Sequence, residues 1–109
     1  MNSDILFGAL ADPTRRRVVE MLGAGPMRAG ELAEGAGVSP PVMSRHLRLL
    51  LESEVVDDER SPADARVRLF FLNREVLAAL QTWLDQAQAP FKQDVESRGV
   101  AKASEPLGG

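Results

Sequence analysis

The chain has 109 residues, 44% of them hydrophobic, which suits one domain with a modest core. It contains no cysteine, and this excludes disulfides, thiolate metal sites and a cysteine nucleophile. The formal net charge of -3 argues mildly against a nucleic-acid ligand, but the charges are unevenly placed. Six arginines lie between residues 13 and 48 against three acids, whereas residues 52–59 are rich in acids. The sequence therefore sets a basic segment in an acidic chain.

Several classes of function find no support in the sequence. No run approaches the ~18 apolar residues that a membrane span needs, and no charged-then-apolar leader opens the chain. No phosphate loop, glycine-rich fingerprint or nucleophile paired with a base is present. We therefore expect a cytoplasmic protein that is not an enzyme, has no cofactor and has no membrane partner.

Four helices are predicted in the first half of the chain. Asp12 and Ser39 can cap free backbone amides, and the prolines that follow them fit the first helical position, where a missing amide costs no hydrogen bond. Gly23 and Gly37 come where the second and third helices should stop. The predicted ranges are 3–10, 13–22, 29–36 and 40–52.

The fourth helix has two unlike faces. Met43, Leu47 and Leu50 recur at helical spacing, so this side should be buried. The opposite side is polar and cationic and is formed by Pro40, Pro41, Ser44, Arg45 and Arg48. His46 lies beside the buried stripe, where a packed, hydrogen-bonded role is favoured.

The apolar period then changes from helix to strand. Residues 55–59 and 66–72 are predicted to be strands joined by a turn-rich tip at residues 60–65. Asn73 caps a last helix, which Pro90 should end or kink. We therefore expect a folded domain over residues 1–92 and a flexible tail over residues 93–109.

A short turn containing glycine joins the third and fourth helices, which is typical of a helix-turn-helix with the hairpin as a wing. The segments ALADPTRRRVVEML, ELAEGAGVSPPVMSRHLRLLLESEVV and RLFFLN resemble the ArsR family of bacterial winged helix-turn-helix repressors. The resemblance spans about residues 5 to 90. The predicted fold is mainly α with a small β-hairpin, in the order α-α-α-α-β-β-α.

The resemblance implies a partner, double-stranded DNA, and the residue chemistry fits it. A helix with short side chains and hydrogen-bond donors near its start can enter the major groove, where arginine pairs with guanine through two hydrogen bonds. The candidate recognition residues are Ser39, Pro40, Pro41, Ser44, Arg45 and Arg48, and the candidate wing residues are Arg60, Arg66 and Arg68. Of Arg15, Arg16 and Arg17, one can reach a phosphate, and the sequence does not say which.

The resemblance also implies a homodimer built from the first and last helices, reading an inverted-repeat operator. Repression is the commoner sign of regulation for this family. The candidate interface residues are apolar: Ile5, Leu6, Leu10, Leu80, Trp83, Leu84 and Phe91.

Metal sensing is not expected, because the third helix has no thiol, the last helix has no histidine, and one histidine cannot form a zinc site alone. The chain therefore resembles the subgroup without metal ligands, and its effector is unknown. Glu54 stands where the family usually has glycine, which puts the turn before the first strand in question. Two alternatives stay open: a protein-interaction module, and a repressor relieved by a small molecule bound between the dimer helices.

Overall fold

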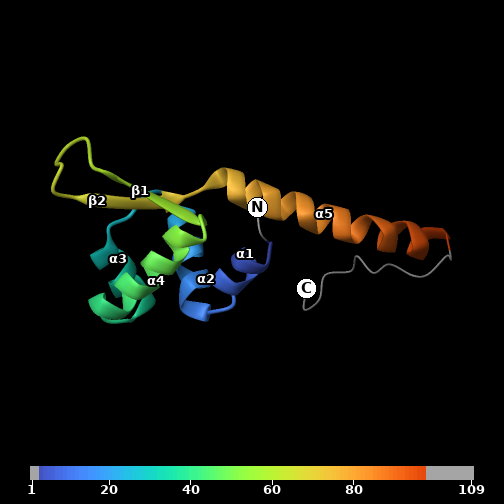
Figure 1. Ribbon diagram of the computed structural model, residues 1–109, viewed down its shortest axis with the longest axis horizontal. Helices are drawn as coiled ribbons and strands as arrows, with labels where there is room; N and C mark the ends of the chain where they lie inside the picture. The colour runs from blue at the N-terminus through green and yellow to red at the C-terminus, as the bar shows by residue number, and fades with distance from the viewer. Residues whose placement is uncertain (1–2, 98–109) are drawn as a thin grey trace. The chain divides into compact units, whose positions relative to one another are not determined.

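The computed structural model describes residues 3–97, with residues 91–97 as backbone only. The predicted order of four helices, a hairpin and a last helix is confirmed (Figure 1). The elements are α1 (Ser3–Ala9), α2 (Pro13–Leu22), α3 (Ala29–Ala36), α4 (Pro40–Glu52), β1 (Val56–Arg60), β2 (Arg68–Leu72) and α5 (Arg74–Ser97). The chain divides after Leu77 into two units, the second of which continues α5.

The helices of the first unit begin and end where local chemistry dictates. The Asp12 carboxylate accepts a hydrogen bond from the amide of Arg15 at 3.1 Å, and Pro13 follows in the first helical position. The Ser39 hydroxyl accepts from the amide of Val42 at 3.4 Å, so α4 opens on its two prolines without an uncapped turn. At the end of α3, Gly37 adopts a left-handed conformation with φ of 69°.

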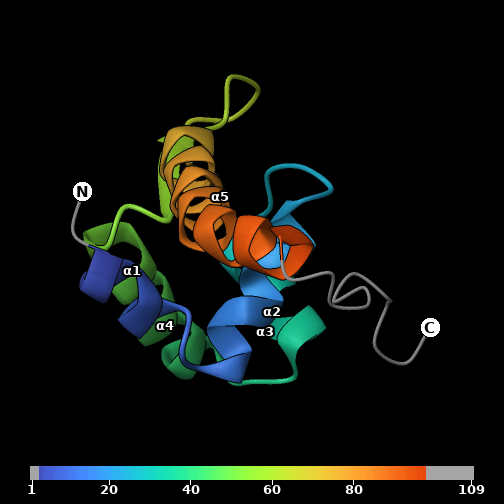
Figure 2. The same cartoon turned by 90° about the vertical axis from the view of Figure 1, so that its right-hand side faces the viewer.

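The core of the first unit is built from one face of each helix and from the hairpin. The predicted stripe of α4 is confirmed, since Met43, Leu47 and Leu50 are at most 3% exposed. Other buried side chains are Leu6, Val18, Leu22, Leu32, Val55, Val56 and Phe70. Figures 1 and 2 show α4 grouped with the other helices of this unit, and α2, α3 and β1 pack against it.

The hairpin is shorter than predicted, and its base is tied to the helices. β1 and β2 are antiparallel with Val56 opposite Leu72, but β2 begins at Arg68 because the two residues before it belong to the loop. Before α3, Met27 exchanges two backbone hydrogen bonds with Phe70, at 3.0 and 2.8 Å. This bridge, which the sequence did not predict, attaches β2 to the start of the helix-turn-helix.

The turn between α4 and β1 keeps the geometry that a glycine would give it. Glu54 has a φ of 63°, the left-handed region that side chains with a Cβ adopt at a cost. The amide of Val55 then donates to the carbonyl of Leu50 at 3.0 Å, which satisfies the end of the helix. The departure from glycine therefore leaves the turn in place.

The last helix begins as predicted, and of the two outcomes expected at Pro90, an end or a kink, the end is contradicted. Asn73 Oδ1 accepts from the amides of Glu75 and Val76 at 3.2 and 3.3 Å. Pro90 lies inside α5, which continues to Ser97 across the expected boundary at residue 92. The rest of the expected tail, residues 98–109, lies outside the described residues. Over the part that is described, no helix has the length and hydropathy to cross a membrane.

Candidate nucleic-acid interface

The outer face of α4 presents the predicted recognition residues to solvent. Ser39, Pro40, Pro41, Ser44, Arg45 and Arg48 are all exposed, and we call them the reading face. Within residues 3–97, the guanidinium groups of Arg45 and Arg48 have no hydrogen-bonding or ionic partner. Two guanidinium groups therefore extend from one helix with all their hydrogen-bond donors available, and such donors are what the acceptor atoms of a base edge or a phosphate bind.

A groove of about 640 Å³ lies between α4 and the hairpin. Ser44 and Arg48 line it from α4, and Arg66 and Arg68 line it from the wing. Arg28, just before α3, lines it as well. Sequence reasoning did not assign Arg28 to the site, because only the fold brings it beside α4; its place in the basic segment was the one available signal. Four arginines and one acid, Glu52, thus border a groove that overlaps the reading face, and Arg28 itself pairs with Glu31 at 3.4 Å.

The wing arginines differ from those of the reading face because two of the three form ion pairs with carboxylates of the same chain. Arg66 donates to Asp64 through its Nε and Nη2, each at 3.1 Å, and Arg68 pairs with Asp58. The Arg66 guanidinium lowers the pKa of Asp64, and the carboxylate in turn raises the pKa of Arg66. Arg60 is exposed, and its side chain has no hydrogen-bonding or ionic partner among the residues described. Of the three predicted wing contacts, only Arg60 carries an uncompensated charge.

The acidic strand β1 presents most of its charge to solvent. Asp57 and Glu59 are exposed, whereas Asp58 is half-buried against Arg68. Arg68 also lies over the ring of Phe70, with its guanidinium carbon 4.8 Å from the ring centre. Asp58 and Phe70 therefore hold the Arg68 side chain along the hairpin.

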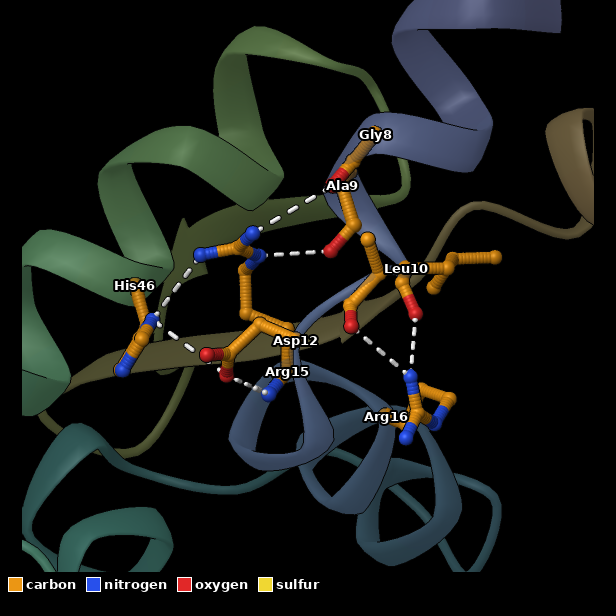
Figure 3. A network of polar contacts seen from close by, with 8 residues as sticks. Gly8, Ala9, Leu10, Asp12, Arg15, Arg16 and His46 are labelled. Carbon is orange, nitrogen blue, oxygen red and sulfur yellow. Dashed lines mark hydrogen bonds and ion pairs between the residues drawn. The ribbon is translucent and has the colours of Figure 1, made fainter.

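His46 is held inside a polar network, in line with its predicted packed role (Figure 3). Its Nδ1 lies 3.2 Å from Nη1 of Arg15 and 4.0 Å from the Asp12 carboxylate, and its side chain is 17% exposed. Arg16 donates to the carbonyls of Leu10 and Ala11 at 2.9 and 3.1 Å. The hydrogen bond from the Arg15 amide lowers the pKa of Asp12.

The third arginine of this run behaves differently from the other two. Arg17 is 3.8 Å from Glu20 with both side chains more than half exposed, so this pair is weak. Arg15 and Arg16 are held by backbone carbonyls. Arg17 is thus the member of the run with the least restrained side chain.

The apolar residues predicted for the dimer interface fall into two groups. Ile5, Trp83 and Leu84 are 54%, 44% and 39% exposed. Leu6, by contrast, is 1% exposed and packs in the core of its own chain, so it offers no surface to a partner. Leu10 and Leu80 are half-buried, and the side chain of Phe91 lies outside the described part.

Among the described residues, no three His, Asp or Glu side chains converge as metal ligands would.

Comparison with known proteins gives consistent results. Residues 10–59 match the model of a helix-turn-helix domain family. The chain is 42% identical over 100 residues to the HTH-type transcriptional regulator Rv2034 of Mycobacterium tuberculosis, covering 88% of this chain and 91% of the relative. It is 37% identical over 79 residues to the transcriptional repressor SdpR of Bacillus subtilis, covering 72% and 84%. A crystal structure of the ArsR family transcriptional regulator RHA00566 matches with a TM-score of 0.71 and 31% identity, over 82% of this chain and 94% of that one.

Two helices joined by a tight turn, with a hairpin behind them, define a winged helix-turn-helix, a class of DNA-binding domain. In this class the second helix of the motif enters the major groove, and the second helix here is α4, whose arginines are exposed. With the relatives above, the chain belongs to the ArsR family of transcriptional regulators and is a DNA-binding regulator of transcription.

Proposed function

We propose that the protein is a homodimeric repressor that binds an inverted-repeat operator and acts in the cytoplasm. The observation that carries this proposal is the reading face, where Arg45 and Arg48 are exposed and have no partner within the described chain. An exposed arginine that is not neutralised internally keeps its full charge and all its donors for a ligand. A helix that docked a protein would more often present several apolar anchors. On α4 the most exposed large apolar side chain is Leu49, with 37% of its surface exposed, so the docking alternative has less support.

The proposed complex has α4 in the major groove, with Arg45 on a base edge and the two prolines near a thymine methyl group. The groove bordered by Arg28, Arg48, Arg66 and Arg68 then faces the phosphates beside that major groove. Arg60 adds a contact from the wing. In this arrangement α4 supplies sequence selectivity, and the wing supplies mainly affinity.

Dimerisation is proposed because one reading helix contacts too few base pairs for useful selectivity. In the single chain, residues 81–90 of α5 are all exposed, although Trp83 and Leu84 are large and apolar. Ile5 of α1 is exposed as well. An apolar stripe of this kind is stable in water when a second copy covers it.

The proposal includes an operator upstream of the protein's own gene, as is common among the regulators that the chain resembles. It is tested with the full-length protein and two duplexes, that upstream DNA and a scrambled duplex of equal length. Fluorescence anisotropy at several salt concentrations should give tighter binding to the upstream duplex and an affinity that falls steeply with salt. A chelator should leave the binding unchanged. Equal affinity for both duplexes at every salt concentration would contradict the proposal.

The dimer is tested separately by sedimentation. Leu84→Glu places a charge on the apolar stripe and should shift the protein toward monomer, whereas Thr82→Glu, on the opposite side of α5, should not. A Leu84→Glu protein that remains fully dimeric would remove α5 from the interface.

A further inference from the structure

Arg15 connects three segments that are distant in sequence (Figure 3). Its Nε donates to the carbonyl of Ala9 at 2.6 Å, and its Nη2 donates to the carbonyl of Gly8 at 3.3 Å, so it closes the end of α1. Its backbone amide donates to the Asp12 carboxylate at the start of α2. Its Nη1 reaches Nδ1 of His46 on α4 at 3.2 Å, across 31 residues of sequence.

The direction of the contact to α4 follows from the chemistry of the two groups. Arginine has donors only, so in this contact at 3.2 Å the Nη1 of Arg15 is the donor, and the Nδ1 of His46 is the acceptor when that nitrogen carries no proton. The other charged group at this nitrogen, Asp12, lies farther off at 4.0 Å. His46 is mostly buried, so little water competes for the same bond.

The position of His46 makes this contact relevant to DNA. His46 follows Arg45 directly in α4 and lies on the inner side of the helix, while Arg45 lies on the outer side. A rotation of α4 by about 10° moves a side chain about 6 Å from the helix axis by about 1 Å. An error of this size is enough to spoil a hydrogen bond to a base.

We propose that Arg15 is a positioning residue that fixes the rotation of α4 against the end of α1, with His46 as its acceptor on α4. The inference rests on the proposed function, because its consequence is operator selectivity. Arg15 touches no DNA in this account; it sets the orientation from which Arg45 reads. Since α1 also carries the proposed dimer residue Ile5, Arg15 joins the dimer helix to the reading helix.

Arg16 provides a matched control. Like Arg15, it donates two hydrogen bonds to backbone carbonyls, here those of Leu10 and Ala11 in the turn that follows α1. Unlike Arg15, it has no contact with α4 among the residues described. Arg15→Gln and Arg16→Gln therefore each remove one positive charge and two hydrogen bonds to nearby carbonyls. Only Arg15→Gln also removes the contact with His46 on α4.

The experiment measures, for each variant, the melting temperature and the ratio of affinities for the upstream and scrambled duplexes. Arg15→Gln should lower this ratio about tenfold, the equivalent of one hydrogen bond to a charged group. Arg16→Gln should change it less than about twofold while costing a similar loss of melting temperature. His46→Asn should keep the ratio near that of the wild type, because its Oδ1 can accept where Nδ1 does, whereas His46→Leu should lower it as Arg15→Gln does.

Two results would overturn the role of Arg15: an unchanged ratio in Arg15→Gln, or an equal loss in Arg16→Gln. If Arg15→Gln does not fold, the two His46 variants provide the test. Equal affinity ratios for His46→Asn and His46→Leu would also overturn the role of Arg15. A wild-type protein without preference for the upstream duplex would instead contradict the proposed function. The two failures are therefore distinguishable.

Discussion

Replacing Arg45 with alanine is the sharpest test of the reading face. Arg45 is exposed and has no partner within residues 3–97, so its removal breaks no internal contact and should change stability by less than about 0.5 kcal/mol. A bidentate arginine–guanine pair contributes about 1–3 kcal/mol of discrimination, and a dimer loses two of them. Operator affinity should therefore fall by about 2–6 kcal/mol, or roughly 30-fold to 10⁴-fold.

The assay compares anisotropy titrations of operator and scrambled duplexes at one salt concentration. In the complex with either duplex, the variant lacks one positive charge on each protomer, but only the operator complex also loses contacts to bases. The ratio of the two affinities therefore isolates the role of Arg45 in base recognition. Arg74 offers a control, since it is exposed, has no partner in the described chain, and lines a hollow on another side of the hairpin. Arg74→Ala should leave the ratio unchanged. Equal losses on both duplexes in Arg45→Ala would refute the base-reading role.

Three further predictions concern the wing, the turn after α4 and the cap of α2. Asp64→Asn should free Arg66, strengthen binding to any duplex and steepen the salt dependence by about one unit for each phosphate that Arg66 newly neutralises, measured by titration at several salt concentrations; an unchanged slope would keep Arg66 out of the interface. Glu54→Gly should raise the free energy of unfolding in urea by up to about 1 kcal/mol, because glycine adopts a positive φ without strain; a loss of stability would show that the side chain compensates. Folding lowers the pKa of Asp12 from 3.8, so the contribution of its ionised carboxylate to stability is complete above that pH and is lost as the pH falls through the folded-state pKa. The melting temperature of the wild type should therefore exceed that of Asp12→Ala by less and less below about pH 4. A constant difference down to about pH 2 would contradict this.

The helices of the first unit were predictable because their ends depend on nearby residues. Asp12, Ser39 and Gly37 act on backbone groups within a few positions, so the sequence shows both the signal and its target. The buried stripe of α4 was predictable for the same reason, since helical spacing alone places Met43 and Leu50 on one side. The reading face then follows as the side that remains.

The parts that could not be predicted depend on partners far along the chain. The extent of β2 is set by its pairing with β1 and Met27, whereas the amides of Arg66 and Val67 donate to Asp64 in the preceding turn. That Arg68 is paired with Asp58, while Arg45 has no such partner among the described residues, is likewise a matter of tertiary placement. The partner of Arg66, Asp64, lies only two residues away. The helix also passes through Pro90, although a proline there removes one backbone hydrogen bond.

The backbone bridge between Met27 and Phe70 bears on what kinds of operator this regulator can accept. Because two backbone hydrogen bonds join β2 to the segment just before α3, the hairpin is held in a fixed position relative to the helix-turn-helix that contains α4. In the proposed complex, the distance along the DNA between the base that α4 contacts and the phosphates that the wing contacts is then set by the protein. Within each half-site, insertion of a single base pair should therefore be tolerated poorly, and in the proposed dimer any adjustment to operator spacing comes from the junction between the two protomers.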